Sequence, residues 1–529
     1  MSTIQAELAP RSTDGRFNVY NPANHEIIGA LPSLTADEIA IAVGKARTAQ
    51  AHWAATPVAS RLRVIRRFQQ LLCEQRDAVA AVITREAGKP LAEALATEVL
   101  VVLDTTKYLL DSVPAFLRPE PVPHANPTMK LKRGRLCREP YGVIGIISPW
   151  NYPFSLPAVQ ALTALATGNA VVLKPSEFTP FASLELARLL NQAGLDHDLL
   201  QVVTGEGPAG AALLQSPIDK LLFTGSVATG KRVALAAAAR LLPVVLELGG
   251  KDPMIVLADA DINVASSAAV WGAFMNAGQT CLSVERCYVH ESIYDGFLRS
   301  CVEKTAKLRL GPGTDPATDV GPMIHERQLH IVEHHVEDAI ARGAGLLAGG
   351  KTLPQLGANF FAPTILAGVD HSMAIMREET FGPVLPVRSF KTEDEAVALA
   401  NDSDFGLAAS VWTRDRSRGE AVARRINAGT VMVNDVIACF GISEAPHGGI
   451  KSSGIGRTHG RFGLEEMVWP KYIDSDRLPG MKKLWWYGYG PAFSQQMEGF
   501  IDLLFGSRLI KRIQGAIKST QAYLHRKPF

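Results

Sequence analysis

A series of short apolar segments, each separated from the next by roughly enough residues for a helix, most strongly constrains the fold of this chain. The series begins at Gly142 and consists of GVIGIISP, NAVVLKPS, LLQVVTGE, KLLFTGS and LPVVLELGG. Strands of a parallel sheet that is covered by helices on both faces have this nearly continuous apolar character. The pattern therefore predicts an α/β domain.

A second alternation of strands and helices is found in the other half of the chain. Its candidate strands are DPMIVLAD, VLPVRSF, SVWTRD and TVMVND, and the stretches TEDEAVALAND and RSRGEAVARRIN have helical spacing. A chain of 529 residues is also too long for a single hydrophobic core of usual size. We therefore predict a second α/β domain, and a site between two such domains is a common place for small ligands.

Residues 35–90 have a helical pattern. Thr35 and Glu38 have the spacing of a capping box at a helix N-terminus. Apolar residues then recur on one helical face, at Leu62, Ile65, Phe68 and Leu72. The triplet Gly88-Lys89-Pro90 predicts the end of this helical region.

Composition and charge narrow the class of protein. With 47% hydrophobic and 20% charged residues, the chain has the balance of a soluble globular enzyme. Its 54 lysines and arginines are matched by 52 aspartates and glutamates, so there is no general electrostatic reason to expect a nucleic-acid partner.

Cysteine usage and the N-terminal sequence bear on the cellular setting. The cysteines, at 73, 137, 281, 287, 301 and 439, form no CxxC pair and no dense disulfide framework, which predicts a reducing, cytoplasmic environment. The opening MSTIQAELAPRSTDGRF lacks the order of a signal peptide. No apolar run approaches the roughly 18 residues that span a bilayer, so we expect no membrane crossing.

Cys281 and Glu247 are the first candidates for chemistry. Cys281 lies in the polar stretch NAGQTCLSVE, but free cysteines are often buried small hydrophobes, so the thiol alone does not identify a nucleophile. Glu247 ends an apolar segment and precedes two glycines, where a loop can hold a carboxylate. The alternative is a glutamate at the surface end of a strand.

Three other segments carry residues suited to binding. The turn Gly225–Gly230 joins a strand to a helix, where free backbone N–H groups can bind phosphate, although a plain helix-starting turn has the same pattern. Lys174 and Glu177, in KPSE, can hydrogen-bond ribose hydroxyls, although a solvated loop would have the same pattern. In PWNYP the amide of Asn151 can donate to an oxyanion, or the segment is a structural turn.

These segments, taken in order, resemble the motifs of the aldehyde dehydrogenase superfamily. The matching segments are PWNYP, KPSE, FTGSVATG, ELGGKDP, NAGQTC, EETFGPV and GGIKSSGIGR, and the resemblance runs from about residue 16 to residue 478. Each motif is short, but their shared order over much of the chain makes coincidence a poor explanation. The resemblance implies an α/β fold with a Rossmann-like NAD-binding domain, an α/β catalytic domain and a small β oligomerisation element.

The resemblance also implies domain boundaries. The NAD-binding domain takes residues 1–118 and 139–246, and the catalytic domain takes residues 247–465. The oligomerisation element takes residues 119–138 and 466–478, which implies a homodimer or homotetramer. Residues 479–529 lie beyond it as an amphipathic C-terminal extension.

A role for each matched residue is implied in the same way. Cys281 matches the nucleophile, Glu247 the general base that activates water, and Asn151, with the Cys281 backbone N–H, the oxyanion hole. At the adenosine ribose, the implied cofactor contacts are Lys174 and Glu177. Ser226 is implied at the pyrophosphate, in a turn that Gly225 and Gly230 frame. At the nicotinamide and its ribose the implied contacts are Glu379 and Phe381, and Trp150 is a further implied cofactor contact.

These roles predict NAD-dependent oxidation of an aldehyde to the free acid. A thiolate adds to the carbonyl, hydride leaves to the cofactor, and water hydrolyses the resulting thioester. Glu177 near the ribose 2′ position would repel a 2′-phosphate, whereas Lys174 partly offsets that repulsion. We therefore expect NAD, with NADP less favoured, and no metal.

The substrate is less well defined by the sequence. Tyr152, Trp271 and Phe274 predict an apolar pocket lining without fixing its length. No arginine stands beside Cys281 to favour a carboxylate-bearing aldehyde, although Arg286 is close in sequence. His447 stands where relatives commonly have an aromatic residue, and we interpret it as a satisfied loop histidine rather than a substrate contact.

The last fifty residues differ from the rest in composition. Apolar residues with roughly helical spacing are Phe493, Met497, Phe500, Ile501, Leu504, Phe505, Leu509, Ile510 and Ile513, and the nearby positive charges are Arg508, Lys511, Arg512 and Lys518. Residues 480–529 therefore predict peripheral contact with a membrane at its cytoplasmic face, with Trp485, Trp486 and Tyr487 at the headgroups. This arrangement is similar to that of fatty aldehyde dehydrogenases and favours a long-chain aldehyde. The alternative is a helix docked on a neighbouring subunit.

Two rival functions compete with this interpretation. His330, Glu333 and His334 form an HxxEH pattern, the spacing of an inverted zinc-peptidase site, but the surrounding helix is charged and has no evident third ligand. The second rival is a catalytically silent binding protein on the same fold. A binding role would not require Cys281, Glu247 and Asn151 together.

Overall fold

The computed structural model describes residues 15–483 and 485–525. The expectations that concern residues 1–14, including the character of the N-terminal sequence, lie outside the described residues. The chain divides into two compact units. The larger unit comprises the chain up to Arg118 and Arg138–Pro470, and the smaller unit comprises Pro119–Cys137 and the chain from Lys471 onward.

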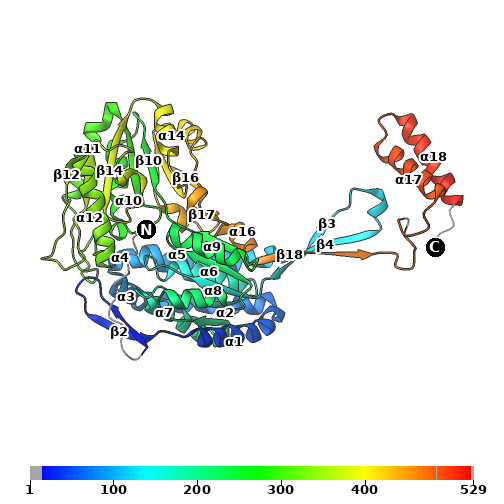
Figure 1. Cartoon of the computed structure of the whole chain (residues 1–529), viewed down its shortest axis with the longest axis horizontal. Helices are drawn as coiled ribbons and strands as arrows, with labels where there is room; N and C mark the ends of the chain where they lie inside the picture. The colour runs from blue at the N-terminus through cyan, green and yellow to red at the C-terminus, as the bar shows by residue number, and fades with distance from the viewer. Residues whose placement is uncertain (1–14, 484, 526–529) are drawn as a thin grey trace. The chain divides into compact units, whose positions relative to one another are not determined.

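A six-stranded sheet forms one half of the larger unit, in the order β17-β9-β8-β5-β6-β7 (Figure 1). Its strands are β5 (Val143–Ile147), β6 (Ala170–Lys174), β7 (Leu200–Val202), β8 (Lys220–Thr224), β9 (Val244–Glu247) and β17 (Gly454–Ile455). All neighbours pair in parallel except β17 and β9. The five apolar segments from Gly142 onward supply β5 to β9, which confirms the predicted parallel sheet.

Helices cover both faces of this sheet. The helices that follow the strands are α6 (Ser155–Ala166), α7 (Pro180–Gln192), α8 (Gly207–Gln215) and α9 (Val227–Ala238). The helices α1 (Ala36–Ala55) and α8 pack together over β5 and β6. Helix α6 packs against the same two strands and also contacts α7, which packs against β7. The core of this half is correspondingly apolar, and every residue of β6 is buried.

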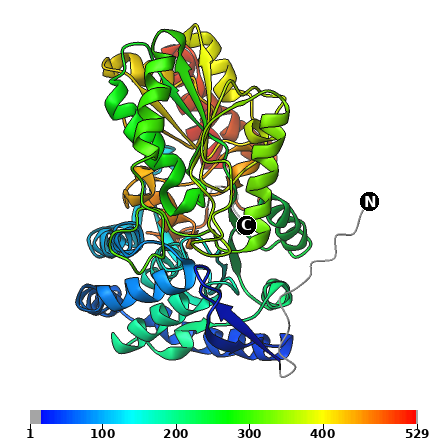
Figure 2. The ribbon, with the colours of Figure 1, turned by 90° about the vertical axis from the view of Figure 1, so that its left-hand side faces the viewer.

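A seven-stranded sheet forms the other half of the larger unit, in the order β12-β13-β14-β11-β10-β15-β16. Its strands are β10 (Asp252–Val256), β11 (Val284–His290), β12 (Gly345–Ala348), β13 (Thr364–Ala367), β14 (Val384–Phe390), β15 (Ala408–Trp412) and β16 (Thr430–Val433). Only β12 and β13 pair antiparallel. Figure 2 shows this sheet and its green and yellow helices above the blue helices of the first half. The predicted second alternation of strands and helices is present, and it lies in the same compact unit as the first sheet, so a separate second domain stays a prediction.

The helices of the seven-stranded half follow its strands in turn. They are α10 (Ile262–Phe274), α11 (Tyr294–Thr305), α12 (Glu326–Ala341), α13 (Ala374–Arg377), α14 (Glu393–Asn401) and α15 (Arg416–Ala423). The two stretches predicted as helices from TEDEAVALAND and RSRGEAVARRIN form α14 and α15.

The N-terminal region matches its helical prediction and adds a hairpin. Strands β1 (Arg16–Tyr20) and β2 (Ile27–Pro32) pair antiparallel. Thr35 and Glu38 form the predicted capping box of α1. After α2 (Val58–Glu74) and α3 (Arg76–Ala87), the chain turns at Gly88 as predicted. It then resumes a helical path from Leu91 through α4 (Leu91–Ala94) and α5 (Leu100–Phe116), because proline is compatible with the start of a helix.

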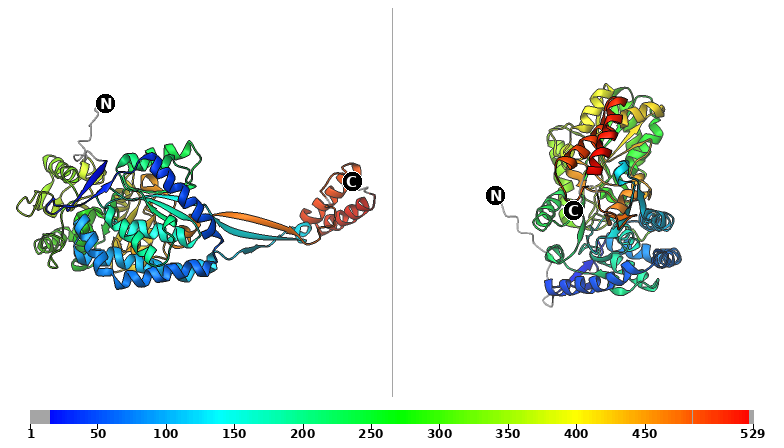
Figure 3. Two further views of the ribbon diagram at one scale, coloured as in Figure 1. Left: turned by 90° about the horizontal axis from the view of Figure 1, so that it is seen from below. Right: turned by 90° about the vertical axis from the view of Figure 1, so that its right-hand side faces the viewer.

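The smaller unit contains a β element and a helical hairpin. Strands β3 (Glu120–Val122), β4 (Lys132–Pro140) and β18 (Val468–Asp476) form a three-stranded sheet, of which β4 and β18 begin or end in the larger unit. Helices α17 (Pro491–Phe505) and α18 (Leu509–His525) pack along each other, drawn in red in Figure 3. Among the described residues, no helix is both long enough and apolar enough to span a bilayer.

Candidate active site

The loop that carries Cys281 begins with an unusual backbone turn. Asn276, Ala277 and Gly278 have φ values of 52°, 54° and 71°, so three consecutive residues lie in the left-handed region. Residues other than glycine rarely adopt this conformation. A Cβ on Gly278 would overlap the backbone of Gly382, so this turn brings the Cys281 loop directly against the segment that contains Glu379 and Phe381.

Side-chain amides join this loop to PWNYP. The Nδ2 of Asn151 donates to the backbone oxygen of Gln279 at 3.0 Å. Asn276 Nδ2 donates to the same oxygen and to the backbone oxygen of Asn151, both at 3.1 Å. The hydroxyls of Tyr152 and Thr280 are 2.8 Å apart. These bonds fix the Asn151 amide beside the Cys281 loop, although the two segments are about 130 residues apart in sequence.

A buried ion pair between Lys89 and Glu98 contacts the segment PWNYP and the helix that follows it. Lys89 and Glu98 are 2.7 Å apart, and both side chains are fully buried. The other carboxylate oxygen of Glu98 accepts the N–H groups of Phe154 and Ser155 at the N-terminus of α6. The Lys89 ammonium also lies 3.7 Å from the centre of the Tyr152 ring. No local motif predicts these roles, because Lys89 stands in the sequence only as part of a helix stop.

Glu247 lies at the end of β9 and faces inward. Its residue is 5% exposed, so the alternative of a surface glutamate is wrong. Neither carboxylate oxygen has a hydrogen-bond partner among the described residues. Burial raises the pKa of Glu247 well above its usual range, and the charge of Arg457 opposes this shift. A carboxylate whose pKa is raised in this way accepts a proton more readily than an exposed one, which suits a general base.

Cys281 is partly buried and has acidic neighbours. Burial raises the pKa of the Cys281 thiol well above its usual value, and the carboxylates of Asp252, Glu379 and Glu247 raise it further. A Cβ on Gly250, three residues after Glu247, would lie 2.4 Å from the backbone oxygen of Cys281, so the Cys281 loop packs against the segment that follows Glu247. In this environment the sulfur remains protonated until a base removes the proton or a positive charge approaches.

The residues expected at a dinucleotide's phosphates and adenosine lie at the carboxyl ends of parallel strands. Lys174 ends β6, and its ammonium is 3.2 Å from the carboxylate of Glu177. Ser226 caps α9 by accepting the N–H of Thr229. Gly225 donates to the backbone oxygen of Glu247, and Gly230 closes the first turn by donating to that of Ser226. This edge of an α/β sheet is where nucleotides commonly bind, and the N-terminus of a helix such as α9 favours an anionic ligand.

Glu379, Phe381 and Trp150 lie on the other side of the loop. Glu379 accepts the N–H of Gly250 at 3.1 Å, and burial raises its pKa to about 8. The Phe381 and Trp150 rings meet edge to face, with centroids 5.4 Å apart. Glu379, Phe381 and Trp150 are thus gathered near the Cys281 loop.

A second buried ion pair holds the segment that contains Glu379 and Phe381. The carboxylate of Glu285 accepts the N–H groups of Thr380 and Phe381, both at 2.9 Å. Lys251 lies 2.5 Å from Glu285 and also donates to the Thr380 hydroxyl. No local motif predicts this pair, because Lys251 lies in the connection between β9 and β10 and Glu285 lies in β11.

The expected substrate-pocket residues have different environments. Tyr152 is 8% exposed and contacts the Cys281 loop through Thr280. Phe274 is buried in the core of the seven-stranded half, while Trp271, one helical turn earlier on α10, is 46% exposed. Arg286 is buried and donates to the backbone oxygens of Lys251, Leu399 and Ala400. Its guanidinium is therefore committed to structural bonds.

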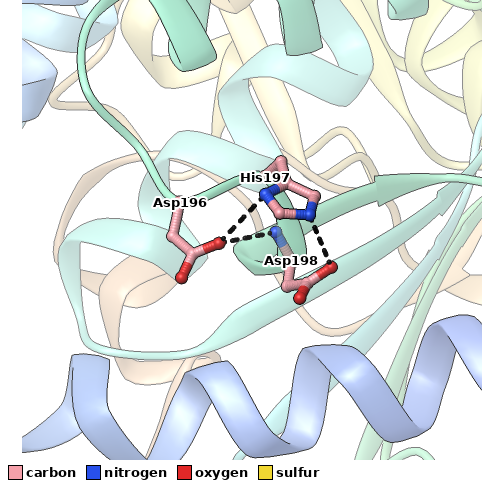
Figure 4. Close-up of side chains that lie close together, drawn as sticks. All are labelled: Asp196, His197 and Asp198. Atoms are coloured by element: carbon pink, nitrogen blue, oxygen red, sulfur yellow. Dashed lines mark hydrogen bonds and ion pairs between the residues drawn. The ribbon is translucent and has the colours of Figure 1, made fainter.

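The possible metal ligands are accounted for by local interactions. His330 is exposed on α12 and pairs with Glu333 at 2.9 Å and Glu326 at 3.5 Å. Within the described part of the chain, only Asp196, His197 and Asp198 bring three ligand atoms close together (Figure 4). Asp196 there accepts the N–H of Asp198, which is the ordinary cap of a short 3₁₀ turn.

Comparisons with known proteins agree with this geometry. The model of the Aldehyde dehydrogenase family matches residues 9–473. The 4,4'-diapolycopene aldehyde oxidase of Methylomonas sp is 41% identical over 488 residues, which cover 92% of this chain and 91% of that protein. An NAD-dependent aldehyde dehydrogenase from Sinorhizobium meliloti has a TM-score of 0.85 and 38% identity, and the match covers 89% of this chain and 93% of that chain. A succinate-semialdehyde dehydrogenase from Burkholderia pseudomallei has a TM-score of 0.83 and 37% identity, with coverage of 88% and 95%.

Proposed function

Because this chain belongs to the aldehyde dehydrogenase family, we propose that it oxidises an aldehyde to the carboxylic acid with NAD, through a thioester on Cys281. One observation carries the proposal. The Asn151 amide is bonded to the loop of Cys281 at Gln279, and the same loop packs at Gly250 against the segment that follows the unpartnered carboxylate of Glu247. A nucleophile, an oxyanion donor and a base are the groups that this reaction requires.

In the first step, the Cys281 sulfur adds to the carbonyl carbon of the aldehyde. The negative charge that develops on oxygen is stabilised by the Asn151 amide and by the Cys281 backbone N–H. NAD supplies the hydride acceptor when bound. The bound NAD would be held by Lys174, Glu177, Ser226, Glu379 and Phe381, with Gly225, Gly230 and Trp150.

In the second step, Glu247 takes a proton from water as the water oxygen attacks the thioester carbon. The bond from carbon to sulfur breaks, and the acid leaves while Cys281 regains its thiolate. The high pKa of Glu247 suits this role, because the carboxylate is then a stronger base than an exposed glutamate.

Replacement of Cys281 tests this function. We expect Cys281→Ala to abolish aldehyde-dependent NADH formation while NAD binding is retained, with absorbance and fluorescence titration as the measurements. Cys73→Ala is the matched control, because Cys73 is exposed and outside the site. Turnover of Cys281→Ala close to that of the parent would contradict the proposal and favour a binding protein.

We propose NAD rather than NADP as the preferred cofactor. The carboxylate of Glu177 would repel a 2′-phosphate, and its 3.2 Å pair with Lys174 already occupies the nearest ammonium. Comparable catalytic efficiency with the two cofactors would show the preference to be wrong.

For the substrate, we propose an apolar or long-chain aldehyde. The guanidinium of Arg286 is bonded to backbone oxygens, so it does not offer a partner for a carboxylate-bearing aldehyde. One similar protein is named for an aldehyde of diapolycopene and another for succinate semialdehyde. A panel of straight-chain aldehydes from acetaldehyde to octadecanal, with succinate semialdehyde included, would rank these classes by kcat/KM.

We further propose that the C-terminal hairpin makes peripheral contact with a membrane. The seam between α17 and α18 contains Gly499, Gly515, Ser519 and Ala522, and a Cβ on either glycine would come within about 2.5 Å of the opposite backbone. Large apolar side chains lie outside instead, and the exposed ones are Ile501, Phe505, Leu509, Ile510, Ile513, Ile517, Tyr523 and Leu524. A hairpin with small residues inside and large apolar residues outside is suited to an apolar environment.

Flotation with anionic liposomes tests the membrane proposal. We expect the full chain to float and a chain that ends at residue 479 to remain in the soluble fraction. Equal recovery of both in the soluble fraction would contradict membrane contact. We also propose a homodimer or homotetramer that forms through residues 119–138 and 466–478. A change of oligomeric state on truncation, measured by light scattering, would indicate that the hairpin docks on a neighbouring subunit instead of a membrane.

A further inference from the structure

His447 lies in a loop that closes over Glu247. Its backbone exchanges two hydrogen bonds with Thr458, both of 2.8 Å. Its ring meets the rings of Phe440 and His459 edge to face, with centroids 5.1 Å and 5.7 Å away. The residue is only 4% exposed, so packing fixes both the position and the orientation of the imidazole.

Unpartnered polar atoms are concentrated in this cluster. Among the described residues, Glu247 Oε1 and Oε2, His447 Nδ1 and His459 Nε2 are all buried without a hydrogen-bond partner. The Nε2 of His447 is 3.8 Å from Oε2 of Glu247. A shift of less than about 1 Å would bring the two atoms within hydrogen-bond distance. Buried polar atoms normally find partners, so several unpartnered ones in one place indicate a functional arrangement.

The charges around this pair determine which proton it can share. Arg457 acts on Glu247 and on His447, Glu466 acts on Glu247, and His459 acts on His447. Burial, together with the neighbouring His459 and the charge of Arg457, lowers the pKa of His447 to about 3. The imidazole is therefore neutral at physiological pH and carries one N–H. The Nε2 atom nearest to Glu247 can be the donor.

We propose that His447 is a positioning residue that donates its Nε2–H to the Glu247 carboxylate and holds it ionised and oriented for thioester hydrolysis. This inference rests on the proposed function, because it assigns a partner to the general base. During hydrolysis the proton of the attacking water moves to Glu247, the bond from acyl carbon to Cys281 sulfur breaks, and His447 keeps its own proton. After the acid leaves, Glu247 releases its proton to solvent, and the hydrogen bond from His447 favours that release.

Hydrolysis of p-nitrophenyl acetate isolates this step from hydride transfer. The ester acylates Cys281 in a burst of nitrophenolate, and the following steady state reports hydrolysis of the acyl-enzyme. For His447→Phe, which keeps an aromatic ring but removes the N–H, we expect a normal burst. We also expect the acid limb of the steady-state pH profile to move upward by about one pH unit, which is roughly a tenfold loss of rate on that limb.

Two further variants separate this role from simple packing. His447→Gln retains an N–H donor, so we expect it to restore much of the parent pH profile. His330→Phe removes an exposed imidazole of α12 that lies outside this cluster, so we expect the acid limb to stay near that of the parent.

The outcomes also distinguish this inference from the proposed function. An unchanged acid limb in His447→Phe, with a normal burst, overturns the role of His447 alone. An equal shift in His447→Phe and His447→Gln shows that the ring only packs, which also overturns it. Absence of a burst and of aldehyde-dependent NADH formation in the parent chain overturns the proposed function itself.

Discussion

Burial affects Cys281 and Glu247 in the same direction. Each group is easier to protonate than it is in water, because the site disfavours negative charge on both. The proposed reaction requires each of them in its deprotonated form, one as a nucleophile and the other as a base. The two groups therefore make pH a direct probe of the site.

We predict that kcat/KM for an aldehyde rises with pH across the range from about 6 to about 9. The fraction of thiolate at Cys281 increases throughout this range because the pKa of the thiol is raised, and acidification also protonates Glu247 earlier than an exposed glutamate. Initial rates of NADH formation in buffers of constant ionic strength provide the measurement. A profile that is flat from about pH 6 upward would contradict the raised pKa values.

At the residue scale, sequence motifs identify the candidate site but not its supports. Asn151, Glu247 and Cys281 lie in short motifs, so each can be proposed from local sequence alone. Lys89 and Glu98 lie in no such motif, because the function of Glu98 arises only when the fold brings the N-terminus of α6 to it from more than 50 residues away. The inward position of Glu247 could not be predicted either, since a strand end is compatible with both burial and exposure.

At the scale of elements, the segment from Glu378 to Gly382 depends on a neighbouring strand. It is an irregular segment between α13 and β14, and its backbone N–H groups at Thr380 and Phe381 are bonded to Glu285 of β11. Lys251 forms an ion pair with that buried carboxylate. The position of Glu379 and Phe381 thus depends on an ion pair in the seven-stranded sheet.

We predict that Glu285→Ala lowers the free energy of unfolding by about 3–5 kcal/mol, because it leaves the buried Lys251 ammonium without its partner. It also frees the segment of Glu379 and Phe381, so we expect weaker NAD binding. Urea denaturation and fluorescence titration give the two measurements. Asp319→Ala, which breaks an exposed pair with Arg309, is the control and should change neither property appreciably.

The difference between apolar strands and strands with buried charges explains which elements can be predicted from the sequence. Strands β5, β6 and β8 are nearly all apolar, so their burial on both faces can be predicted from the sequence. The sequence pattern does not predict strand β11, because VERCYVH contains two charged residues that are nevertheless buried. Their charges are compensated by Lys251 and by backbone oxygens of distant segments, which no local pattern reveals.

At the scale of the whole molecule, several buried carboxyl groups favour their protonated form. Burial raises the pKa of Glu86 to about 8, although the carboxylate also accepts the N–H groups of Phe181 and Ala182 at the start of α7. Burial raises the pKa of Glu93 to about 7 and that of Glu379 to about 8. In the unfolded chain the same groups ionise near their ordinary values.

We predict that the free energy of unfolding decreases as the pH rises from about 6.5 to about 8. The folded chain still holds protons that the unfolded chain has released, so the stabilisation is full below the unfolded pKa and is lost as pH passes through the folded pKa. Each carboxyl that keeps its proton contributes a slope of about 1.4 kcal/mol per pH unit. Urea denaturation at several pH values measures the slope, and Glu86→Gln should make it shallower. A stability that increases over this range would contradict the raised pKa values.

The backbone oxygen of Gln279 accepts one amide from each half of the larger unit, Asn151 from the six-stranded half and Asn276 from the seven-stranded half. A hinge motion that widened the space between the halves would stretch the bond from Asn151, together with the bond from Asn276 to the Asn151 backbone oxygen and the contact between the Tyr152 and Thr280 hydroxyls. The Asn151 amide would then move away from the carbonyl that it polarises. An opened enzyme would therefore lose activity through a change in geometry alone, with every catalytic residue still present.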